Sequence, residues 1–335
     1  MVNSILVAAA VNSIADILKA KDIPYEIEDS AAYKSYMKVW DRSSKKDLAY
    51  RQARPAMERI LSREYFAFVK GGVPMRIRLN DPSRKMEDSF AEILLERTDL
   101  NWHIAISVKL NANIIATLPF AGREQDMFED HVVGAVNEID DFGDRIFGVP
   151  CSNEYFDDMN EILLKIAPYD KESWRAFLKE ETLIYDTLLS PILRALGSEI
   201  KKICEDHPEA PARMFDFFYG KYDYYYINPI EQVKVTKIGA LNAHGDLGRL
   251  PDNDNHTTAY IKYPTKLLDV RFANGKYGQL SKDTLQFTFD GGWALCFKVM
   301  PGKDRTKGRT FELNVYVPVT PFGSYRDQVD WDPEA

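Results

Sequence analysis

The sequence predicts an α/β protein (α+β) whose C-terminal part is rich in β-strands. Apolar residues recur at helical spacing in residues 1–65, two short apolar runs flank a polar turn near residue 100, and segments of alternating polarity follow residue 233. A chain of 335 residues can form two domains. We expect an N-terminal helical segment at 1–45, a core at 46–230 and a basic β-rich region at 231–325.

Composition restricts the class of protein. No apolar run has the length of a membrane span, and the amphipathic opening lacks a basic leader, so we expect neither a membrane protein nor a secreted one. Cys151, Cys204 and Cys296 have no paired spacing, which argues against a disulfide framework or zinc motif and indicates a reducing cytoplasm. The net charge of −8 argues against indiscriminate coating of nucleic acid but allows a local basic surface.

The N-terminal elements are expected to be mainly helical. Residues 1–45 contain two helical segments separated at Ile23-Pro24, and residues 45–65 form another helix that Pro55 kinks or restarts. Glu58 lies in that helix, as either a metal ligand or an ordinary solvated carboxylate. Residues 73–79 alternate in polarity as a strand does, and a turn follows at 80–83.

The apolar runs 93–95 and 104–106 predict a β-hairpin. A fold-back between residues 100 and 101 would pair residues whose numbers sum to about 201. Glu92 then lies across from Val108 and Lys109, and strand alternation places Ser107 on the same face as Lys109. Such a group suits phosphodiester hydrolysis, in which a carboxylate holds Mg²⁺ and a lysine orients water. The alternative is that these are solvated charges at strand ends.

The remaining chain divides into a helical part and a strand-rich part. Residues 114–166 are expected to be helical and acidic, without the EF-hand spacing of a calcium loop. Residues 172–203 predict one or two helices interrupted near Ser190-Pro191. Hairpin-type turns punctuate the alternating segments after residue 233. Residues 257–311 carry a net charge of about +6, which indicates either a nucleic-acid surface or a solvated face.

The hairpin and the blocks that follow it resemble the HaeIII-like type II restriction endonucleases over about residues 50–318. Glu92-Ile-Leu-Leu, followed by Ile104-Ala-Ile-Ser-Val-Lys-Leu-Asn, resembles the catalytic hairpin of that family. Similar ordered landmarks follow at 141–143, 149–155, 219–225, 283–285 and 292–298. The resemblance implies a restriction-endonuclease-like mixed sheet flanked by helices, with residues 46–230 as a nuclease core of the PD-(D/E)xK type. It also implies Mg²⁺-dependent cleavage of double-stranded DNA at a short sequence.

The resemblance assigns roles to individual residues. Glu92 would hold the metal and Lys109 would be the catalytic lysine. Ser107 stands where the wider fold places a second acid, so Asp88 or Glu58 is expected to complete the metal site. The residues expected to contact DNA are Asn111, Asn113, Lys298, Lys303, Arg305, Lys307 and Arg309.

Departures from the family pattern bear on the target sequence. His103 stands where an acid is expected, and Lys298-Val-Met stands where the family has Arg-Ile-His. The expected target is GGCC-like or a variant, because arginine suits bidentate guanine recognition better than lysine. The expected setting is a prokaryotic cytoplasm, without membrane contact. A homodimer and a companion DNA methyltransferase in the same system are the partners that the resemblance implies.

Two other functions remain open. The departures at Glu92 and Ser107 also fit a catalytically inactive, sequence-specific DNA-binding protein on a nuclease scaffold. A metal site at His244, Asp246 and His256 would instead resemble the histidine-type nucleases, although these residues also fit a solvated loop.

Overall fold

The computed structural model of the chain describes residues 2–80, 91–108, 114–121, 141–165, 171–251, 256–275, 279–301, 311–316 and 324–331. The helices are α1 (Val2–Ala20), α2 (Ala31–Arg42), α3 (Lys46–Arg63), α4 (Phe142–Phe147), α5 (Asn153–Leu164), α6 (Lys171–Phe177), α7 (Glu181–Ile184), α8 (Ser190–Asp206) and α9 (Ala210–Tyr219). The strands are β1 (Tyr25–Ile27), β2 (Met75–Leu79), β3 (Ile93–Arg97), β4 (Trp102–Val108), β5 (Ile114–Ala121), β6 (Tyr224–Ile230), β7 (Val235–Leu241), β8 (Leu267–Asn274), β9 (Leu280–Phe289), β10 (Ala294–Pro301), β11 (Phe311–Tyr316) and β12 (Arg326–Asp330).

The chain forms two compact units. The first comprises Met1–Ala112, Tyr219–Lys262 and Phe322–Ala335, and the second comprises Asn113–Phe218 and Tyr263–Pro321. These divisions differ from the boundaries expected from sequence, because strands from three distant segments join one sheet in the first unit.

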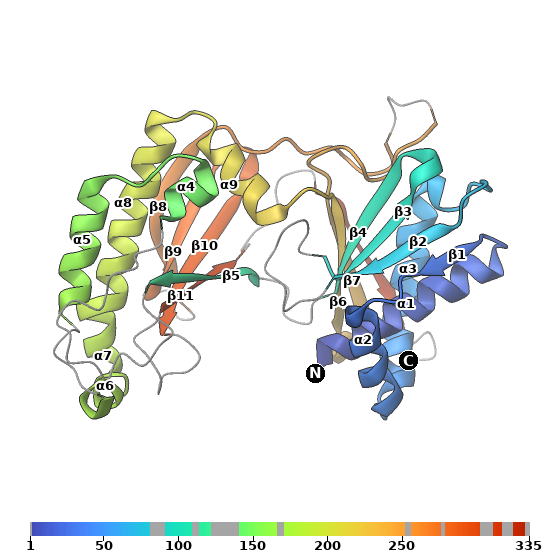
Figure 1. The fold of residues 1–335 in the computed structure, drawn as a ribbon, viewed down its shortest axis with the longest axis horizontal. Coiled ribbons are helices and arrows are strands. Elements are labelled where there is room, and N and C mark those ends of the chain that lie inside the picture. Colours follow the sequence, from blue (N-terminus) through green and yellow to red (C-terminus); the bar gives the residue numbers. More distant parts are fainter. Residues whose placement is uncertain are drawn as a thin grey trace. The chain divides into compact units, whose positions relative to one another are not determined.

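The first unit is built on a seven-stranded mixed sheet of order β1-β2-β3-β4-β6-β7-β12. Its parallel pairs are β1 with β2 and β4 with β6, and its other neighbouring strands are antiparallel. Helices α1 and α3 run along one face of this sheet (Figure 1). Their apolar residues form one core with Ile104, Ile106 and Tyr225. The predicted α/β class, with a mixed sheet flanked by helices, is therefore confirmed.

The N-terminal elements largely match the prediction. The two helices α1 and α2 are separated at Ile23-Pro24, although the short strand β1 follows the break and pairs with β2. Helix α3 continues through Pro55 without a restart. Its buried residues follow helical spacing and face the sheet, so tertiary packing offsets the hydrogen bond that proline cannot donate.

Strands β3 and β4 form the predicted hairpin, but the expected register was wrong. Ile93 pairs with Ile106, so each β3 residue meets a partner two positions earlier than expected. The buried Arg97 explains the shift, because its Nε and Nη2 contact the two carboxylate oxygens of Asp99 at 3.2 Å each. Asn101 then closes the turn in the left-handed conformation, with φ of 46°. If this register is extended by one residue, Ser107 lies beside Glu92.

The second unit contains a five-stranded antiparallel sheet of order β5-β11-β10-β9-β8. Helix α8 packs on this sheet, and a β-carbon at Gly197 would approach Leu285 and Val270 too closely. Phe215 of α9 meets Phe289 and Trp293 in the core, with ring centroids 5.1 and 4.7 Å apart, respectively. The predicted β-rich C-terminal part is confirmed, and Trp293 is buried in the core of this unit.

Two local expectations in this unit needed correction or refinement. Residues 114–121 were expected to be helical but form β5, because they pair with β11 across a long sequence separation. Residues 172–203 are mainly helical as expected, but the interruption lies at 178–180, between α6 and α7. Near Ser190-Pro191 the helix is not broken, because a π-helical turn at Tyr185–Leu189 continues directly into α8.

Candidate active site

The end of the β3–β4 hairpin holds two of the residues predicted for catalysis. Glu92 precedes β3, and its Oε2 accepts a hydrogen bond from the backbone N–H of Val108 at 2.8 Å. Ser107 is buried, and its Oγ has no hydrogen-bond partner among the described residues. Asn80 fixes the approach to β3, because its backbone N–H donates to Glu92 O at 3.0 Å and its side chain donates to Ala91 O at 2.8 Å. A carboxylate is thus held against the last residue of β4.

Glu92 fits one position of a metal site. A carboxylate oxygen is a ligand that Mg²⁺ prefers. Ser107, whose hydroxyl has no hydrogen-bond partner among the described residues, lies on the adjacent strand. Within the described part of the chain, no three His, Cys, Asp or Glu residues are grouped so that they could hold a metal ion. Any further ligands would therefore come from other positions of the chain, from water or from DNA.

Several predicted residues lie outside the described part of the chain. They are Asp88, Lys109, Asn111, Asn113, Lys303, Arg305, Lys307 and Arg309. Their assignments stay predictions.

Glu58 lies on the exposed side of α3. Its Oε1 accepts a hydrogen bond from Arg54 Nε at 2.7 Å, and Arg54 also donates to Tyr50 OH at 2.8 Å. Tyr50 in turn donates to Asp16 of α1 at 2.7 Å. The described contacts of Glu58 therefore belong to a surface network between α1 and α3.

Lys298, in β10 of the second unit, is paired with a carboxylate. Its Nζ lies 2.8 Å from Asp283 Oδ2, and only a third of its side chain is exposed. Burial alone would raise the pKa of Asp283, but hydrogen bonds from Lys298, Ser281 and Thr284 outweigh burial and hold that pKa below its usual value. A contact between Lys298 and DNA would have to compete with this ion pair.

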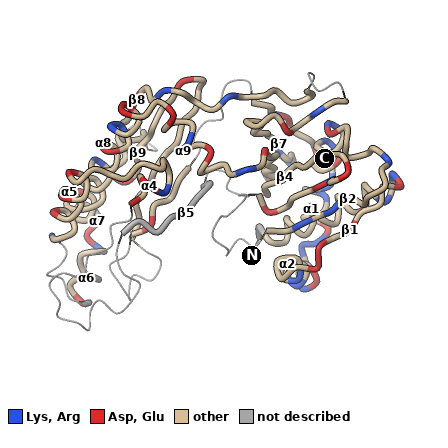
Figure 2. Tube along the Cα trace, turned by 45° about the horizontal axis from the view of Figure 1, so that its top comes forward, with Lys and Arg blue, Asp and Glu red and all other residues tan. Residues whose placement is uncertain are grey.

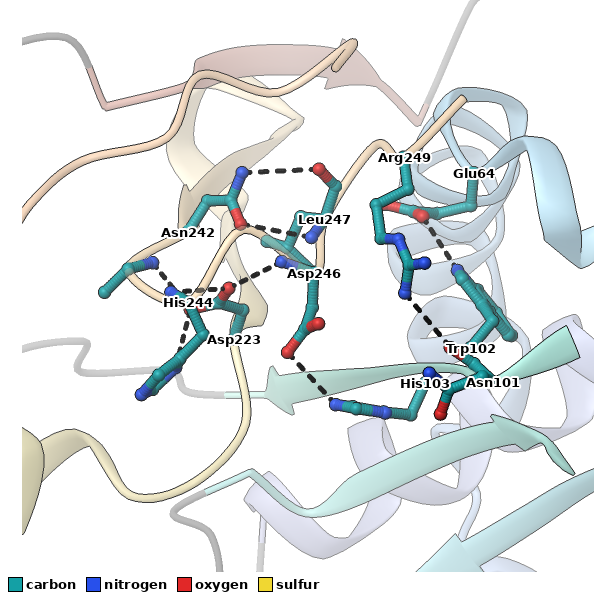
Figure 3. A network of polar contacts seen from close by, with 11 residues as sticks. Glu64, Asn101, Trp102, His103, Asp223, Asn242, His244, Asp246, Leu247 and Arg249 are labelled. Atoms are coloured by element: carbon teal, nitrogen blue, oxygen red, sulfur yellow. Dashed lines mark hydrogen bonds and ion pairs between the residues drawn. The ribbon is translucent and has the colours of Figure 1, made fainter. Parts of the chain in front are cut away.

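At the opposite end of β4, a buried carboxylate organises a loop. Asp223 directly precedes β6 and is 1% exposed. Its oxygens accept hydrogen bonds from the backbone N–H groups of Ala243, His244 and Asp246 at 2.6, 2.9 and 2.9 Å, respectively, and Oδ1 also lies 3.2 Å from His244 Nδ1. Figure 3 shows these groups converging on one side chain. The carboxylate of Asp223 therefore holds three backbone N–H groups of the loop that follows β7.

Asn242 closes the same loop. Its Oδ1 accepts from Leu247 N at 3.1 Å and its Nδ2 donates to Leu247 O at 3.3 Å (Figure 3). The Nδ2 group also donates to Thr258 O at 2.9 Å. The side-chain amide of Asn242 thus provides hydrogen bonds for backbone groups of Leu247 and Thr258, so the buried polar groups of this turn are satisfied.

These contacts argue against the histidine-type metal site. His244 contacts Asp223, Asp246 Oδ2 lies 3.1 Å from His103 Nε2, and His256 Nδ1 lies 3.4 Å from Leu247 O. His244, Asp246 and His256 do not form a group that could hold a metal among the described residues. They support the structure of the loop instead.

The contact between His103 and Asp246 joins the loop to β4. Burial alone would raise the pKa of Asp246, but the hydrogen bond and charge of His103, with the charges of His244 and Arg249, lower it below its ordinary value. Arg249 adds a second link, because its Nη1 donates to Asn101 O at 3.0 Å in the hairpin turn. The loop therefore holds the turn end of the hairpin.

Glu64, which follows α3, is a second buried carboxylate in this network. It is 1% exposed, and it accepts hydrogen bonds from Tyr225 OH, Gly248 N and Trp102 Nε1 at 2.8, 2.8 and 3.2 Å, respectively. Burial raises its pKa, and the three hydrogen bonds offset only part of that effect. One side chain thus ties α3, β4, β6 and the loop together.

Sequence reasoning did not identify Glu64 or Asp223. The aromatic block at 219–225, which contains Asp223, was identified from the sequence. The structural role of Asp223 was not, because the N–H groups that donate to it are 20 or more positions away in the chain. For Glu64 the separation from Gly248 is 184 positions. No local pattern in the sequence signals such contacts.

Comparison with known proteins decides the family. The model of the HaeIII restriction endonuclease family matches residues 6–308, nearly the whole chain. The chain belongs to the HaeIII restriction endonuclease family. The type II restriction enzyme HaeIII of Haemophilus aegyptius is 26% identical over 281 residues, which cover 82% of this chain and 80% of the relative. No solved structure matches.

The family is one of restriction endonucleases, and membership in it implies a site-specific nuclease with DNA as the substrate. None of the described helices is both long and apolar enough to cross a membrane. All three cysteines are in the thiol form, and burial raises the pKa of Cys296 to about 11.

Proposed function

We propose that this HaeIII family member is a type II restriction endonuclease that hydrolyses double-stranded DNA at a short, GGCC-like sequence or a variant of it, in a Mg²⁺-dependent reaction. The observation that carries the proposal is the hydrogen bond from Val108 N to Glu92, which holds a carboxylate beside the end of β4. Lys109 is the next residue of the chain.

Each residue of this group has a separate task in the proposal. Glu92 would hold the metal, which polarises the scissile phosphate and makes a bound water more acidic. Lys109 would orient the attacking water or neutralise charge that develops on the phosphate. We favour Asp88 over Glu58 as the second acid, because Glu58 is already paired with Arg54. Ser107 supplies a hydroxyl where a carboxylate is expected.

The test combines cleavage with sequencing of the cut ends. Unmethylated phage DNA is incubated with Mg²⁺ and the wild-type protein, Lys109→Ala, Glu92→Gln or the surface control Lys38→Ala. Discrete fragments with a common terminal sequence are expected for the wild-type protein and Lys38→Ala only. Full cleavage by Lys109→Ala would contradict the assigned role. DNA methylated at the target should resist cleavage, which is the expected signature of a companion methyltransferase.

The second candidate function is an inactive sequence-specific DNA-binding protein. It is favoured by Ser107, because a buried hydroxyl carries no negative charge to hold a cation. Intact DNA in Mg²⁺, together with sequence-specific binding, would support this alternative and refute the nuclease.

Each chain carries one catalytic hairpin, so a homodimer would offer one site per DNA strand. Sedimentation of the DNA complex can determine the number of chains bound.

A further inference from the structure

On the face opposite α1 and α3, the seven-stranded sheet of the first unit carries polar side chains on β6, β7 and β12. Tyr225, Ile227, Ile238 and Ala240 point into the core beneath α1 and α3. Their chain neighbours on β6 and β7 must point to the opposite face, because successive residues of a strand alternate between faces. Lys237 is exposed on that face, between the buried residues on either side of it.

Strand register arranges this face in rows. Ser107 of β4 pairs with Tyr226 of β6, Tyr226 pairs with Gly239 of β7, and Gly239 pairs with Arg326 of β12. Directly paired residues lie on the same face, so a row leads from the hairpin end to an exposed arginine. Three strand spacings separate Ser107 from Arg326, which is about 14 Å.

The adjacent row has the same polar character. Asn228 pairs with Lys237, and Lys237 pairs with Gln328. Lys237 makes no ion pair with any other described residue, and both Lys237 and Gln328 are exposed. The one carboxylate that β12 adds to this face, Asp330, pairs with Val235 and lies beyond Lys237, away from Ser107. The cations are thus on the side nearer the candidate active site.

Gly239 determines the shape of the row. A β-carbon at this position would collide with the ring and hydroxyl of Tyr226. The Tyr226 side chain therefore lies across β7, with its ring over the glycine, and does not stand upright from the sheet. The phenol of Tyr226 therefore points toward β12. Gly239 itself adds no side chain to the row between Ser107 and Arg326.

We propose that Tyr226, Asn228, Lys237, Arg326 and Gln328, together called the β7 surface, contact the phosphate backbone of duplex DNA beside the hairpin end. This inference rests on the proposed nuclease function and assigns residues to its substrate.

The chemistry of the β7 surface favours phosphate. Lysine, arginine, asparagine, glutamine and tyrosine side chains are the donors that protein–DNA complexes use for phosphate and sugar contacts. Acidic and basic positions are intermixed over the described parts of both units (Figure 2), so local placement has to supply the complementarity that the net charge of −8 does not. A reach of about 14 Å corresponds to about four base-pair steps of 3.4 Å.

The experiment measures binding of a 30-base-pair duplex as a function of salt, with Ca²⁺ in place of Mg²⁺ so that binding is measured without cutting. Lys237→Ala, Arg326→Ala and the double variant are compared with Lys38→Ala, an exposed lysine on α2. Each lost phosphate contact should reduce the slope of log affinity against log salt by about one. When salt rises from 50 to 200 mM, the affinity of a variant that lacks one phosphate contact should therefore fall about 3.5-fold less than the affinity of the wild-type protein. A GGCC duplex and a scrambled duplex should respond equally, because phosphate contacts carry no sequence information.

Gly239→Ala tests the geometry independently of charge. It should weaken binding by displacing Tyr226, and adding Tyr226→Ala should cause much less further loss than Tyr226→Ala causes alone. Circular dichroism and thermal unfolding verify that each variant is folded. A reduced slope in the charge variants, combined with wild-type behaviour of Lys38→Ala, supports the β7 surface.

Two outcomes would overturn the inference while leaving the nuclease intact. In one, wild-type protein cuts DNA while Lys237→Ala and Arg326→Ala retain the wild-type affinity and slope. In the other, the variants lose self-association in sedimentation but bind DNA normally, so that the surface is an interface between two copies. A wild-type protein that binds with the expected slopes but never cuts refutes the proposed function alone. No DNA binding by the wild-type protein refutes both.

Discussion

Glu64 illustrates how one buried side chain couples stability to pH. Its carboxylate is surrounded by three donors, yet burial still raises its pKa above the ordinary value of 4.5. Between the ordinary pKa of the unfolded chain and the raised pKa of the folded protein, Glu64 keeps a proton in the folded protein that the unfolded chain has lost. Stability therefore falls as pH rises through this window, and the contribution is constant below it.

We expect Glu64→Gln to abolish that dependence. The amide oxygen can still accept from Tyr225 and Gly248, while the amide nitrogen faces Trp102 and adds a cost that does not vary with pH. Urea unfolding from pH 4 to 8 measures the difference between the two proteins. The wild type should lose stability relative to the variant as pH rises above 4.5. A constant difference would show that the folded pKa of Glu64 is not raised.

Ser107 leads to a different prediction at the residue scale. Its buried hydroxyl lacks a hydrogen-bond partner among the described residues, so its removal leaves no donor or acceptor unsatisfied. Ser107→Ala should leave the free energy of unfolding unchanged or raise it by up to about 1 kcal/mol. The buried Ser13, whose hydroxyl donates to Ala9 O at 2.7 Å, supplies the matched comparison. A loss of more than about 1 kcal/mol in Ser107→Ala would reveal an interaction with that hydroxyl.

At the scale of elements, the sequence predicted which segments pair more reliably than how they pair. Alternation and apolar runs identified β2, β3 and β4, because these patterns reflect burial of one face. The register between β3 and β4 depended on the ion pair between Arg97 and Asp99 and on the left-handed conformation of Asn101. Residues 114–121 were misassigned, because β5 exists through pairing with β11, which follows it by nearly 200 residues.

The candidate site was predictable to a similar extent. Strand periodicity and the family resemblance both placed Glu92 and Ser107 at the hairpin end, where the structure has them, and their catalytic roles stay predictions. Glu64, Asp223 and Gly239 were not found. Their roles arise from contacts between distant segments, and one sequence without its fold contains no local sign of them.

The loop after β7 provides a prediction at the element scale. Asp223 satisfies the backbone N–H groups of Ala243, His244 and Asp246 within the protein. Hydrogen bonds to a charged acceptor contribute about 1.5–3 kcal/mol each. Asp223→Ala should therefore accelerate amide exchange at these three residues by at least about tenfold.

Hydrogen–deuterium exchange with mass spectrometry resolves this loop. Asp29→Ala is the control, because Asp29 pairs with Lys34 on the surface and its side chain is 74% exposed. That change should leave exchange in the loop unaltered. Equal protection of residues 243–246 in wild type and Asp223→Ala would mean that the loop is held by other contacts.

At the scale of the whole molecule, the two units are interleaved along the chain. The first unit takes β6, β7 and β12 from segments that follow most of the second unit in sequence. Composition could suggest two domains, but it could not locate this division, because sheet membership is set by hydrogen bonds between strands. The basic, strand-rich stretch identified from sequence lies largely in the second unit.

Removal of β12 should therefore affect the first unit selectively. A chain that ends at residue 321 loses the strand that pairs with β7 from Gly239 to Val235, and with it the buried Trp331. Amide exchange should increase in β7 and remain unchanged in β10 of the second unit. A chain that ends at residue 331 keeps β12 and is the control. Increased exchange in β10 as well would show that the two units unfold together.

The parallel pair β4 and β6 has a consequence for synthesis of the protein. About 115 residues separate the end of β4 from the start of β6. At ribosomal rates of about 5–20 residues per second, the edge of β4 waits for roughly ten seconds before its neighbour is made. The last strand of the same sheet, β12, begins more than 200 residues after the end of β4. If Arg326 contacts DNA as proposed, the nascent protein cannot complete its DNA-binding surface until β12 has been synthesised.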